Sequence, residues 1–376
     1  MIYLDHNATT PVLPEVVEAM MPWLTANWGN PSSIHGPGRA ARRAVEQARE
    51  TVAALVGAEP EQVIFTSGAT EANNAALHSA VFRDSAKRHV VTSVVEHSAV
   101  LTYCDYLENV HGVEVTRLPV DSNGTLNPDD LRDTIRPDTA LVSLMWANNE
   151  TGVIWPISEL AAICAKKEVP FHSDAVQAVG KISVSFSEGG LSYLTLSGHK
   201  FGAAKGIGAL IVREAESYLP FVHGGKQEGG LRGGTENVAQ IVGLGEAAGL
   251  AEGRDPAIWT QISNLRDRLE SEILEHIEGA RVNGLGSRRL PNTTNLYLPG
   301  LDGDALLTFL DQREICISSG SACLESAITP SHVILAMTCS HDEASESVRV
   351  SFGLDSNSTD LETVVKSISE FVELMT

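Results

Sequence analysis

The stretch Tyr193-Leu194-Thr195-Leu196-Ser197-Gly198-His199-Lys200 sets the expected architecture of this chain. Its first four residues are apolar, aromatic or β-branched, which is typical of a strand buried inside a sheet. Gly198 then turns the chain, so Lys200 follows the carboxyl end of the strand. A lysine at such a place suits Schiff-base chemistry, because loss of water lowers the pKa of the amine and exposes its lone pair. By itself the pattern fits a solvated loop lysine better.

Strands and helices alternate along the chain before this stretch. We expect strands at residues 63–66, 89–92, 113–115, 140–145, 171–173 and, just after Lys200, 209–212. We expect helices at residues 14–21, 39–56, 71–80, 98–110, from 127 onward, and 156–167. Strands that are apolar along their whole length and alternate with helices predict an α/β fold with a mostly parallel sheet covered on both faces.

The pattern changes after a glycine-rich segment at residues 224–234. Helices are expected at residues 239–250 and 258–277, and alternating strands and helices between 281 and 352. We therefore predict a large domain at residues 14–250. A smaller α+β domain would comprise residues 1–13 and 251–376. The polar arm at residues 3–11 is either a surface lead-in or a part of the site to which Asn7 and Thr9 contribute, and the sequence leaves both open.

The charge balance restricts the class of partner. The chain has 376 residues, with 27 basic and 48 acidic side chains and a formal net charge of −21. Such a field repels nucleic acid and anionic membrane surfaces, so we expect neither as a partner. No apolar run approaches transmembrane length, and the first residues lack the basic and apolar regions of a secretory signal.

The five cysteines are scattered and odd in number, without metal-ligand spacing. They fit a reducing cytoplasm, and we expect a cytoplasmic protein with no metal site. Cys323 follows Gly320-Ser321-Ala322, small residues that suggest an exposed loop and a reactive thiol. Cys316 is expected in the core, and the remaining three, Cys104, Cys164 and Cys339, are expected to be structural.

Polar side chains follow the carboxyl ends of the predicted strands, where open α/β sheets bind ligands. Residues 67–71 enter a helix and offer a phosphate cradle. The later strand ends supply His97, Asn149, Asp174 with Gln177, and Lys200. Each has a plain alternative as a core histidine, a turn residue or a helix cap, but together they match pyridoxal 5′-phosphate.

Each of these groups has an expected task toward that cofactor. Lys200 would hold the aldehyde, and Asp174 would keep the pyridine nitrogen protonated. Gln177 and Asn149 would hydrogen-bond the ring hydroxyl, and His97 would stack on the ring.

Over essentially its whole length the chain resembles cysteine desulfurases of the NifS/IscS type, in the class V aminotransferase branch of fold-type I pyridoxal-phosphate enzymes. The blocks that carry the resemblance are residues 3–10, 65–71, 96–98, 148–152, 174–177, 197–200, 232–237, 318–323 and 348–351. The block Ser318-Ser319-Gly320-Ser321-Ala322-Cys323 is the most specific of them.

The resemblance implies a set of roles. Four residues would hold the phosphate: Ala69, Thr70, Ser197 and His199. Thr235 would reach the phosphate of a partner subunit, which implies a homodimer. Arg349, with Asn149, would bind the substrate carboxylate through a bidentate contact.

The implied reaction uses three catalytic residues, Lys200, His97 and Cys323. The freed Lys200 amine would remove the α-proton of L-cysteine, while His97 manages protons on the substrate. Cys323 would take the sulfur as a persulfide and alanine would leave. The sulfur would then pass to an iron–sulfur scaffold or another acceptor protein.

Three residues depart from the family pattern. Gly229 stands where relatives usually carry arginine, and Leu324 and Glu325 follow Cys323 where small polar residues are common. These departures affect substrate affinity, interface contacts or acceptor choice rather than the chemistry. The alternatives are a selenocysteine lyase or an aminotransferase on the same fold, or a non-catalytic sulfur-carrier subunit. An aminotransferase has no use for Cys323.

Overall fold

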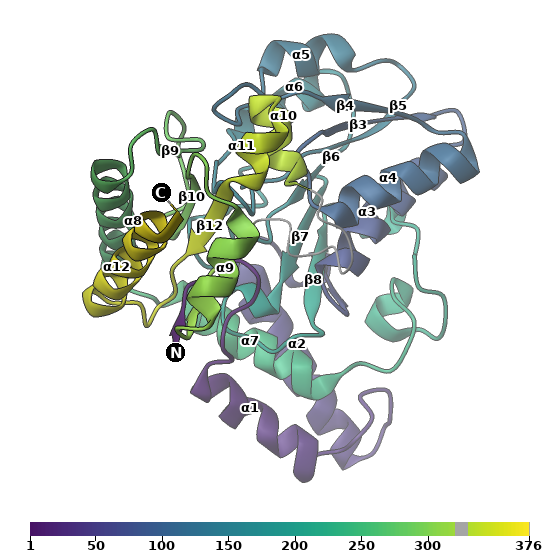
Figure 1. The fold of residues 1–376 in the computed structure, drawn as a ribbon. Coiled ribbons are helices and arrows are strands. Elements are labelled where there is room, and N and C mark those ends of the chain that lie inside the picture. Colours follow the sequence, from purple (N-terminus) through teal and green to yellow (C-terminus); the bar gives the residue numbers. More distant parts are fainter. Residues whose placement is uncertain (320–329, 376) are drawn as a thin grey trace.

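The computed structural model describes residues 1–319 and 330–375 and is built around a seven-stranded sheet (Figure 1). Its strands, in chain order, are β2 (Val63–Thr66), β3 (His89–Ser93), β4 (Glu114–Leu118), β5 (Thr139–Ser143), β6 (Phe171–Asp174), β7 (Tyr193–Ser197) and β8 (Gly208–Val212). Across the sheet the order is β2-β8-β7-β6-β5-β3-β4. β8 runs antiparallel to β2 and β7, and the other neighbouring pairs are parallel. The predicted mostly parallel α/β sheet is confirmed.

Both faces of this sheet are buried. Successive side chains of a strand point to opposite faces, so neighbouring residues of one strand lie in different cores. Phe65 and Ile211 lie in one hydrophobic core, whereas Ile64 and Leu210 lie in another. The first core is shared with α1 (Pro14–Thr25), α2 (Gly36–Leu55), α5 (Pro128–Thr134), α6 (Ile157–Lys166) and α7 (Val238–Glu252). The second is covered by α3 (Ala69–Arg83) and α4 (Ser98–His111). Full burial on both faces explains why the strands are apolar throughout.

Helix α2 shows how the amphipathic pattern positions an element. Its buried residues Ala41, Val45, Ala48 and Val52 recur every three or four positions and form one apolar stripe. The stripe packs on α7, where a Cβ added to Gly245 would lie 2.7 Å from the Ala48 Cβ. The absence of a side chain at this glycine lets the two helices approach closely.

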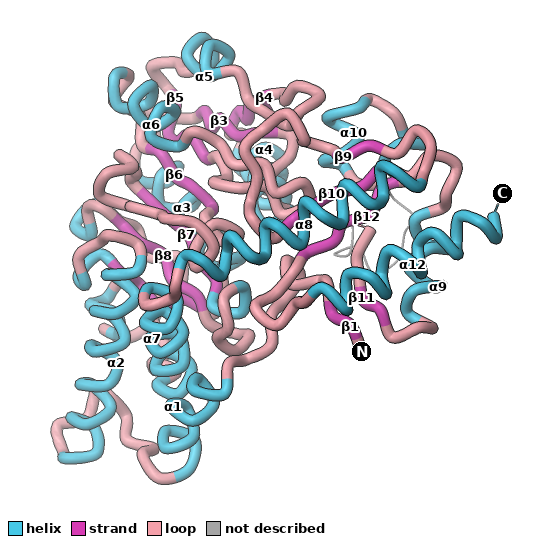
Figure 2. Tube along the Cα trace, turned by 90° about the vertical axis from the view of Figure 1, so that its left-hand side faces the viewer, coloured by secondary structure: helices cyan, strands magenta, loops and turns pink. Residues whose placement is uncertain are grey.

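Most residues of a further hydrophobic core lie in the second half of the chain. The strands that contribute to it lie together beside the seven-stranded sheet, on the right of Figure 2. The elements of this core are β9 (Arg281–Val282), β10 (Thr293–Tyr297), β11 (Ile315–Cys316), β12 (Ser347–Ser351), α8 (Pro256–His276), α9 (Gly303–Asp311) and α12 (Ser358–Met375). The strand order of its three-stranded sheet is β12-β10-β9. By contrast, α10 (His332–Thr338) and α11 (His341–Ser345) contribute Val333, Ile334 and Ala344 to the first core.

The amino-terminal arm belongs to this later core. Strand β1 (Ile2–Tyr3) pairs in parallel with β11, and Leu4 is buried among residues of α8 and α12. Burying a leucine side chain contributes about 2 kcal/mol, so apolar packing holds the arm as well as hydrogen bonds. The predicted boundaries, 14–250 and 1–13 with 251–376, stay a prediction. Within residues 1–319 and 330–375, no helix combines the length and the apolarity needed to cross a membrane.

A buried ion pair joins α2 to the short helix η4 (Gln227–Gly230). The Arg49 Nη1 and Nη2 atoms lie 2.8 Å and 2.9 Å from the Glu228 carboxylate oxygens. The carboxylate also accepts a 2.9 Å bond from the Phe65 backbone N–H, and Arg49 donates to the Val63 carbonyl. The pair therefore fixes the edge strand β2, and it holds Glu228 at a φ of 46° beside Gly229 at 66°.

We expect Arg49→Met to lower the free energy of unfolding by about 3 kcal/mol, because it leaves the Glu228 carboxylate buried without its cation. Urea denaturation measures the difference. Arg42→Met is the matched control, since Arg42 is half exposed and pairs with Glu46 at 3.7 Å on the same helix. Equal effects of the two variants would contradict this account.

His172, on β6, makes stability depend on pH. Its ring lies between Ser143 Oγ (2.8 Å) and Thr195 Oγ1 (3.1 Å), and burial lowers its pKa from 6.5 to about 3. Between pH 6.5 and about 3, His172 is protonated in the unfolded chain and neutral in the folded chain. The contribution of His172 to the free energy of unfolding is therefore complete above pH 6.5. Below that pH it falls by about 1.4 kcal/mol per pH unit.

We expect His172→Gln to flatten the acid limb of the curve of unfolding free energy against pH, because glutamine accepts and donates without titrating. His276→Gln, at an exposed histidine at the end of α8, is the control and should leave the curve unchanged. A curve for His172→Gln that follows the wild type down to pH 4 would refute the assignment.

Candidate active site

Lys200 lies where the sequence predicts it, at the carboxyl end of β7 on the short helix η2 (Gly198–Lys200). Its Nζ donates to the backbone carbonyls of Asn7 (2.6 Å) and Ala8 (2.8 Å). The Thr10 N–H bonds the His199 carbonyl at 2.9 Å, so the arm is tied to the same turn. Lysine and arm therefore form one unit at this edge of the sheet.

Asp174 ends the neighbouring strand β6 and is 7% exposed. Asn73 on α3 donates to its Oδ2 at 2.6 Å, and the Val176 N–H donates to its Oδ1 at 3.0 Å. Both oxygens thus accept hydrogen bonds from neutral donors. A buried carboxylate held this way has lone pairs left to accept a hydrogen bond from an N–H group of a ligand.

His97 caps the amino end of α4, and its Nδ1 accepts the Ala99 N–H at 3.1 Å. This bond leaves the ring proton on Nε2 in the neutral tautomer. Burial lowers the pKa of His97, the charge of Asp174 opposes that shift, and the charge of Lys200 adds to it. The structure therefore brings His97, Asp174 and Lys200 into one site.

The start of α3, where the sequence predicts a phosphate cradle, is a helix end without a side-chain cap. Gly68 has φ 151° and ψ 178°, a conformation that favours glycine, and no side chain caps the helix there. A Cβ at Gly208 would lie 2.9 Å from the Gly68 backbone, so that glycine lets α3 approach the end of β7, where Ser197 pairs with Gly208. Ala69 and Thr70 form the first turn and expose their N–H groups to an anion.

His199 completes the cradle residues expected from the sequence. Its Nδ1 lies 3.1 Å from Thr9 Oγ1, and burial lowers its pKa to about 4. Neutral at physiological pH, His199 can donate one hydrogen bond and accept another. The whole donor set, namely an amine, a buried carboxylate, an imidazole and an uncapped helix end, fits pyridoxal 5′-phosphate.

Arg349 on β12 reaches the site from the other core. Its Nη2 donates to Asp5 Oδ1 at 2.7 Å and its Nη1 to the Asn149 carbonyl at 3.1 Å. Its Nε is buried and has no partner in the part of the chain described. A buried guanidinium with an unsatisfied N–H is suited to bind a carboxylate. The predicted partnership of Arg349 with Asn149 runs, in this structure, through the Asn149 backbone.

Sequence reasoning left the role of Asn7 open and did not single out Asp5, Asn73 or Lys181. Asn7 is 1% exposed, so the arm is not a surface lead-in. Gln177, predicted to contact the ring hydroxyl, donates to the Asn7 carbonyl at 3.0 Å and accepts from Lys181. In the sequence, only the polar character of the arm indicated that it belongs to the site, since the residues that it contacts lie far away along the chain.

Two buried acids, Glu96 and Glu150, also escaped prediction. Glu96 accepts from Ser93 Oγ (2.8 Å) and the Met145 N–H (3.0 Å), and burial raises its pKa to about 8. Burial likewise raises the pKa of Glu150, which accepts from Ser331 Oγ at 2.5 Å. Both acids are held in place by neutral donors.

The remaining predicted residues lie outside this cluster. Thr235 is exposed in the loop before α7, and its contact with a partner subunit stays a prediction. Cys323, Leu324 and Glu325 fall outside the described residues. Cys104 and Cys164 are buried, as expected, but Cys316 is only partly buried, and Cys339 is exposed at the left-handed end of α10. The structural role expected for Cys339 stays a prediction.

Comparisons with known proteins cover nearly the whole chain. The family model described as Aminotransferase class-V matches residues 2–364. A cysteine desulfurase of Cereibacter sphaeroides is 45% identical over 373 residues, which cover 99% of this chain and 96% of that protein. The solved structure of a NifS-like protein is 35% identical, with a TM-score of 0.92 and 99% of each chain covered. SspA in complex with cysteine is 36% identical, with a TM-score of 0.83, over 94% of this chain and 99% of its own.

We expect Gly68→Ala to lower the unfolding free energy by about 1–2 kcal/mol, because alanine is strained at this φ although its Cβ would meet no atom within 4 Å. The same strain should weaken binding of pyridoxal 5′-phosphate to the apoprotein, as measured by equilibrium dialysis. Gly36→Ala serves as control, since it lies at a helix start with equal space and no positive φ. Unchanged affinity in Gly68→Ala would exclude the cradle.

Proposed function

The chain belongs to the class-V aminotransferase family, and we propose that within this family it acts as a pyridoxal 5′-phosphate-dependent cysteine desulfurase. Full-length relatives of this name and solved NifS-like structures confirm the resemblance drawn from the sequence. The observation that carries the proposal is the convergence of Lys200, Asp174 and His97 beside an uncapped helix end. L-cysteine is the proposed substrate, in keeping with SspA, which is similar to this chain and was solved in complex with cysteine.

The residues of the site divide the work of holding the cofactor. Lys200 would bind its aldehyde, and Asp174 would hold its ring nitrogen. The α3 end with Thr70, Ser197 and His199 would take the phosphate. When bound, pyridoxal 5′-phosphate supplies an electron-withdrawing ring that accepts electrons from the substrate α-carbon.

Arg349 would bind the substrate carboxylate. It is 3% exposed, and Asp5 and the Asn149 carbonyl fix two of its nitrogens. Because the guanidinium cannot rotate without breaking these bonds, its position defines where the amino acid lies. The buried, unsatisfied Nε supplies the N–H that a carboxylate would accept.

Lys200 and His97 would move the protons. The Lys200 amine, when free, would take the proton from the α-carbon of the substrate. The Nε2–H of neutral His97 faces a site that also holds the charges of Asp174 and Lys200. With Nδ1 engaged by Ala99, Nε2 is the nitrogen available to exchange protons with the substrate.

Cys323 would receive the sulfur. The bond between Cβ and sulfur of L-cysteine breaks, a sulfur–sulfur bond forms to Cys323, and Cβ gains a proton. The products are alanine and a persulfide, so L-cysteine plus one thiol account for all atoms and electrons. The distal sulfur would pass to an iron–sulfur scaffold or another acceptor protein.

The assembly and compartment belong to the same proposal. Thr235 is exposed in a loop next to the glycine-rich η4, a position open to a second subunit, and we propose a homodimer. The four cysteines of the described residues are unpaired, which suits a reducing cytoplasm.

We expect the purified protein with L-cysteine and a reductant to release alanine and sulfide in equal amounts. Cys323→Ala should lower sulfide release by at least a hundredfold, because no thiol remains to accept sulfur. Cys339→Ser, which alters an exposed thiol, should retain wild-type rates.

Different outcomes separate the alternatives. An aminotransferase would convert the amino acid without sulfide, and Cys323→Ala would leave its rate intact. A non-catalytic carrier subunit would release neither product. Higher turnover of selenocysteine with negligible turnover of cysteine would indicate a selenocysteine lyase.

A further inference from the structure

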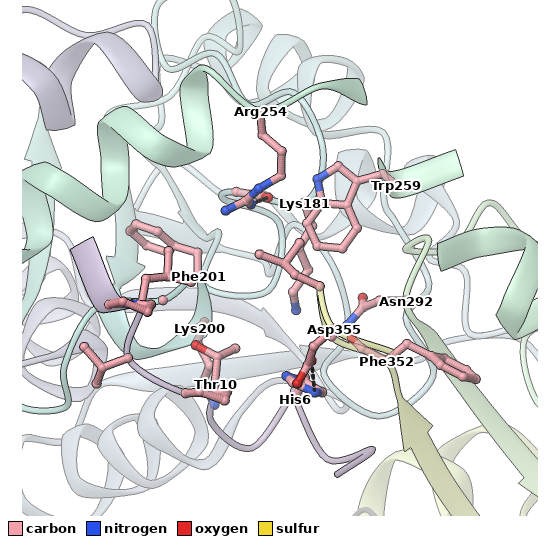
Figure 3. Close-up of a pocket in the computed structure, with 18 residues that line it drawn as sticks. His6, Thr10, Lys181, Lys200, Phe201, Arg254, Trp259, Asn292, Phe352 and Asp355 are labelled. Atoms are coloured by element: carbon pink, nitrogen blue, oxygen red, sulfur yellow. Dashed lines mark hydrogen bonds and ion pairs between the residues drawn. The ribbon is translucent and has the colours of Figure 1, made fainter. Parts of the chain in front are cut away.

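Lys181 is a buried lysine that the proposed reaction does not use. It follows β6 and is 4% exposed. Together with His6, Arg254 and Asn292 it lines a cavity of about 190 Å³, which Lys200 also lines (Figure 3). A lysine this deeply buried needs a structural or functional reason, because an ammonium group loses much of its hydration there.

The Lys181 amine contacts two side-chain oxygens. Its Nζ donates to Gln177 Oε1 at 2.6 Å and to Asn7 Oδ1 at 3.0 Å. An amine that donates to the oxygen of an amide fixes which end of the amide is which, since the amide NH₂ could not accept those protons. Gln177 therefore presents its nitrogen on the opposite side, where one N–H bonds the Asn7 carbonyl at 3.0 Å.

The surroundings of Lys181 lower the pKa of its amine. Burial is the largest cause of its lowered pKa, and the positive charges of Lys200 and Arg349 add to it. His6, Arg254 and Asp355 line the same cavity, and Asp355 lies near His6 at 3.7 Å. The amine donates to two side-chain oxygens, Gln177 Oε1 and Asn7 Oδ1.

We propose that Lys181 is a positioning residue that locks the side-chain amide of Gln177, so that the second N–H of Gln177 is left for the ring oxygen of the cofactor. This inference rests on the proposed function, because Gln177 matters in this way only if pyridoxal 5′-phosphate binds. Lys181 itself touches neither cofactor nor substrate. It acts through the side-chain amide of Gln177.

A double-mutant cycle on cofactor affinity tests the inference. The dissociation constant of pyridoxal 5′-phosphate is measured with the apoprotein of the wild type, Lys181→Met, Gln177→Ala and the double variant. Lys181→Met keeps the aliphatic stem and removes both donors. We expect it to weaken binding about tenfold in the wild-type background, the scale of one hydrogen bond. In the Gln177→Ala background its effect should fall below twofold.

Other outcomes would overturn the inference. A purely structural lysine would weaken binding equally in both backgrounds, or lower the melting temperature without changing affinity. The matched control is Lys166→Met at an exposed lysine of α6, which should change neither quantity. If Lys181→Met does not fold by circular dichroism, Lys181→Leu enters the same cycle.

The absorption spectrum gives a readout independent of affinity. If Gln177 donates to an anionic ring oxygen, loss of that bond disfavours the anion. The pH midpoint of the visible band of the bound cofactor should then rise in Lys181→Met, and an unchanged midpoint would count against the inference. A wild-type protein that binds no pyridoxal 5′-phosphate would contradict the proposed function. That result is distinct from a failed double-mutant cycle and from an unchanged pH midpoint.

Discussion

One asparagine in the amino-terminal arm holds the two halves of the site together. The backbone N–H of Asn7 donates to Ser351 on β12, and its carbonyl accepts from Gln177 and Lys200. The side chain bonds four more groups, in Lys181, Asn292, Thr293 and Asn149. Each hydrogen bond is worth only about 1 kcal/mol, but an unpaired buried amide is expensive, so the network forms as a whole. Because Asn7 bonds residues of both halves of the site, it fixes the distance between Lys200 on η2 and Arg349 on β12.

The site is rich in cations yet avoids an accumulation of charge. Arg349 has a partner in Asp5, and burial together with the neighbouring cations lowers the pKa of Lys181. Burial also keeps His97 and His199 neutral. The fixed charges that remain suit an anionic phosphate and a substrate carboxylate, both of which bring negative charge when they bind.

The features that could be predicted from the sequence are those that depend on residues close together in the chain. The strand before Lys200, the helix entered at Ala69 and the carboxylate at Asp174 all follow from local patterns, and parallel strands then bring their ends together. The sequence could not place Asp5 against Arg349, because 344 positions separate them and no local pattern encodes their contact. The exposure of Cys339 was missed for a related reason. A left-handed residue at the end of α10 turns that thiol outward, and burial depends on what packs over it.

The pairing of β1 with β11 and of Asp5 with Arg349 has a consequence for synthesis of the chain. Residues 2–5 leave the ribosome more than 300 positions before the residues with which they pair, so they must wait for these partners. Contacts of such long range are slow to form, so the arm is the last piece to settle while the central sheet can assemble earlier. A nascent or truncated chain would thus carry the reactive lysine without a finished place for the amino acid, and it would not process its substrate prematurely.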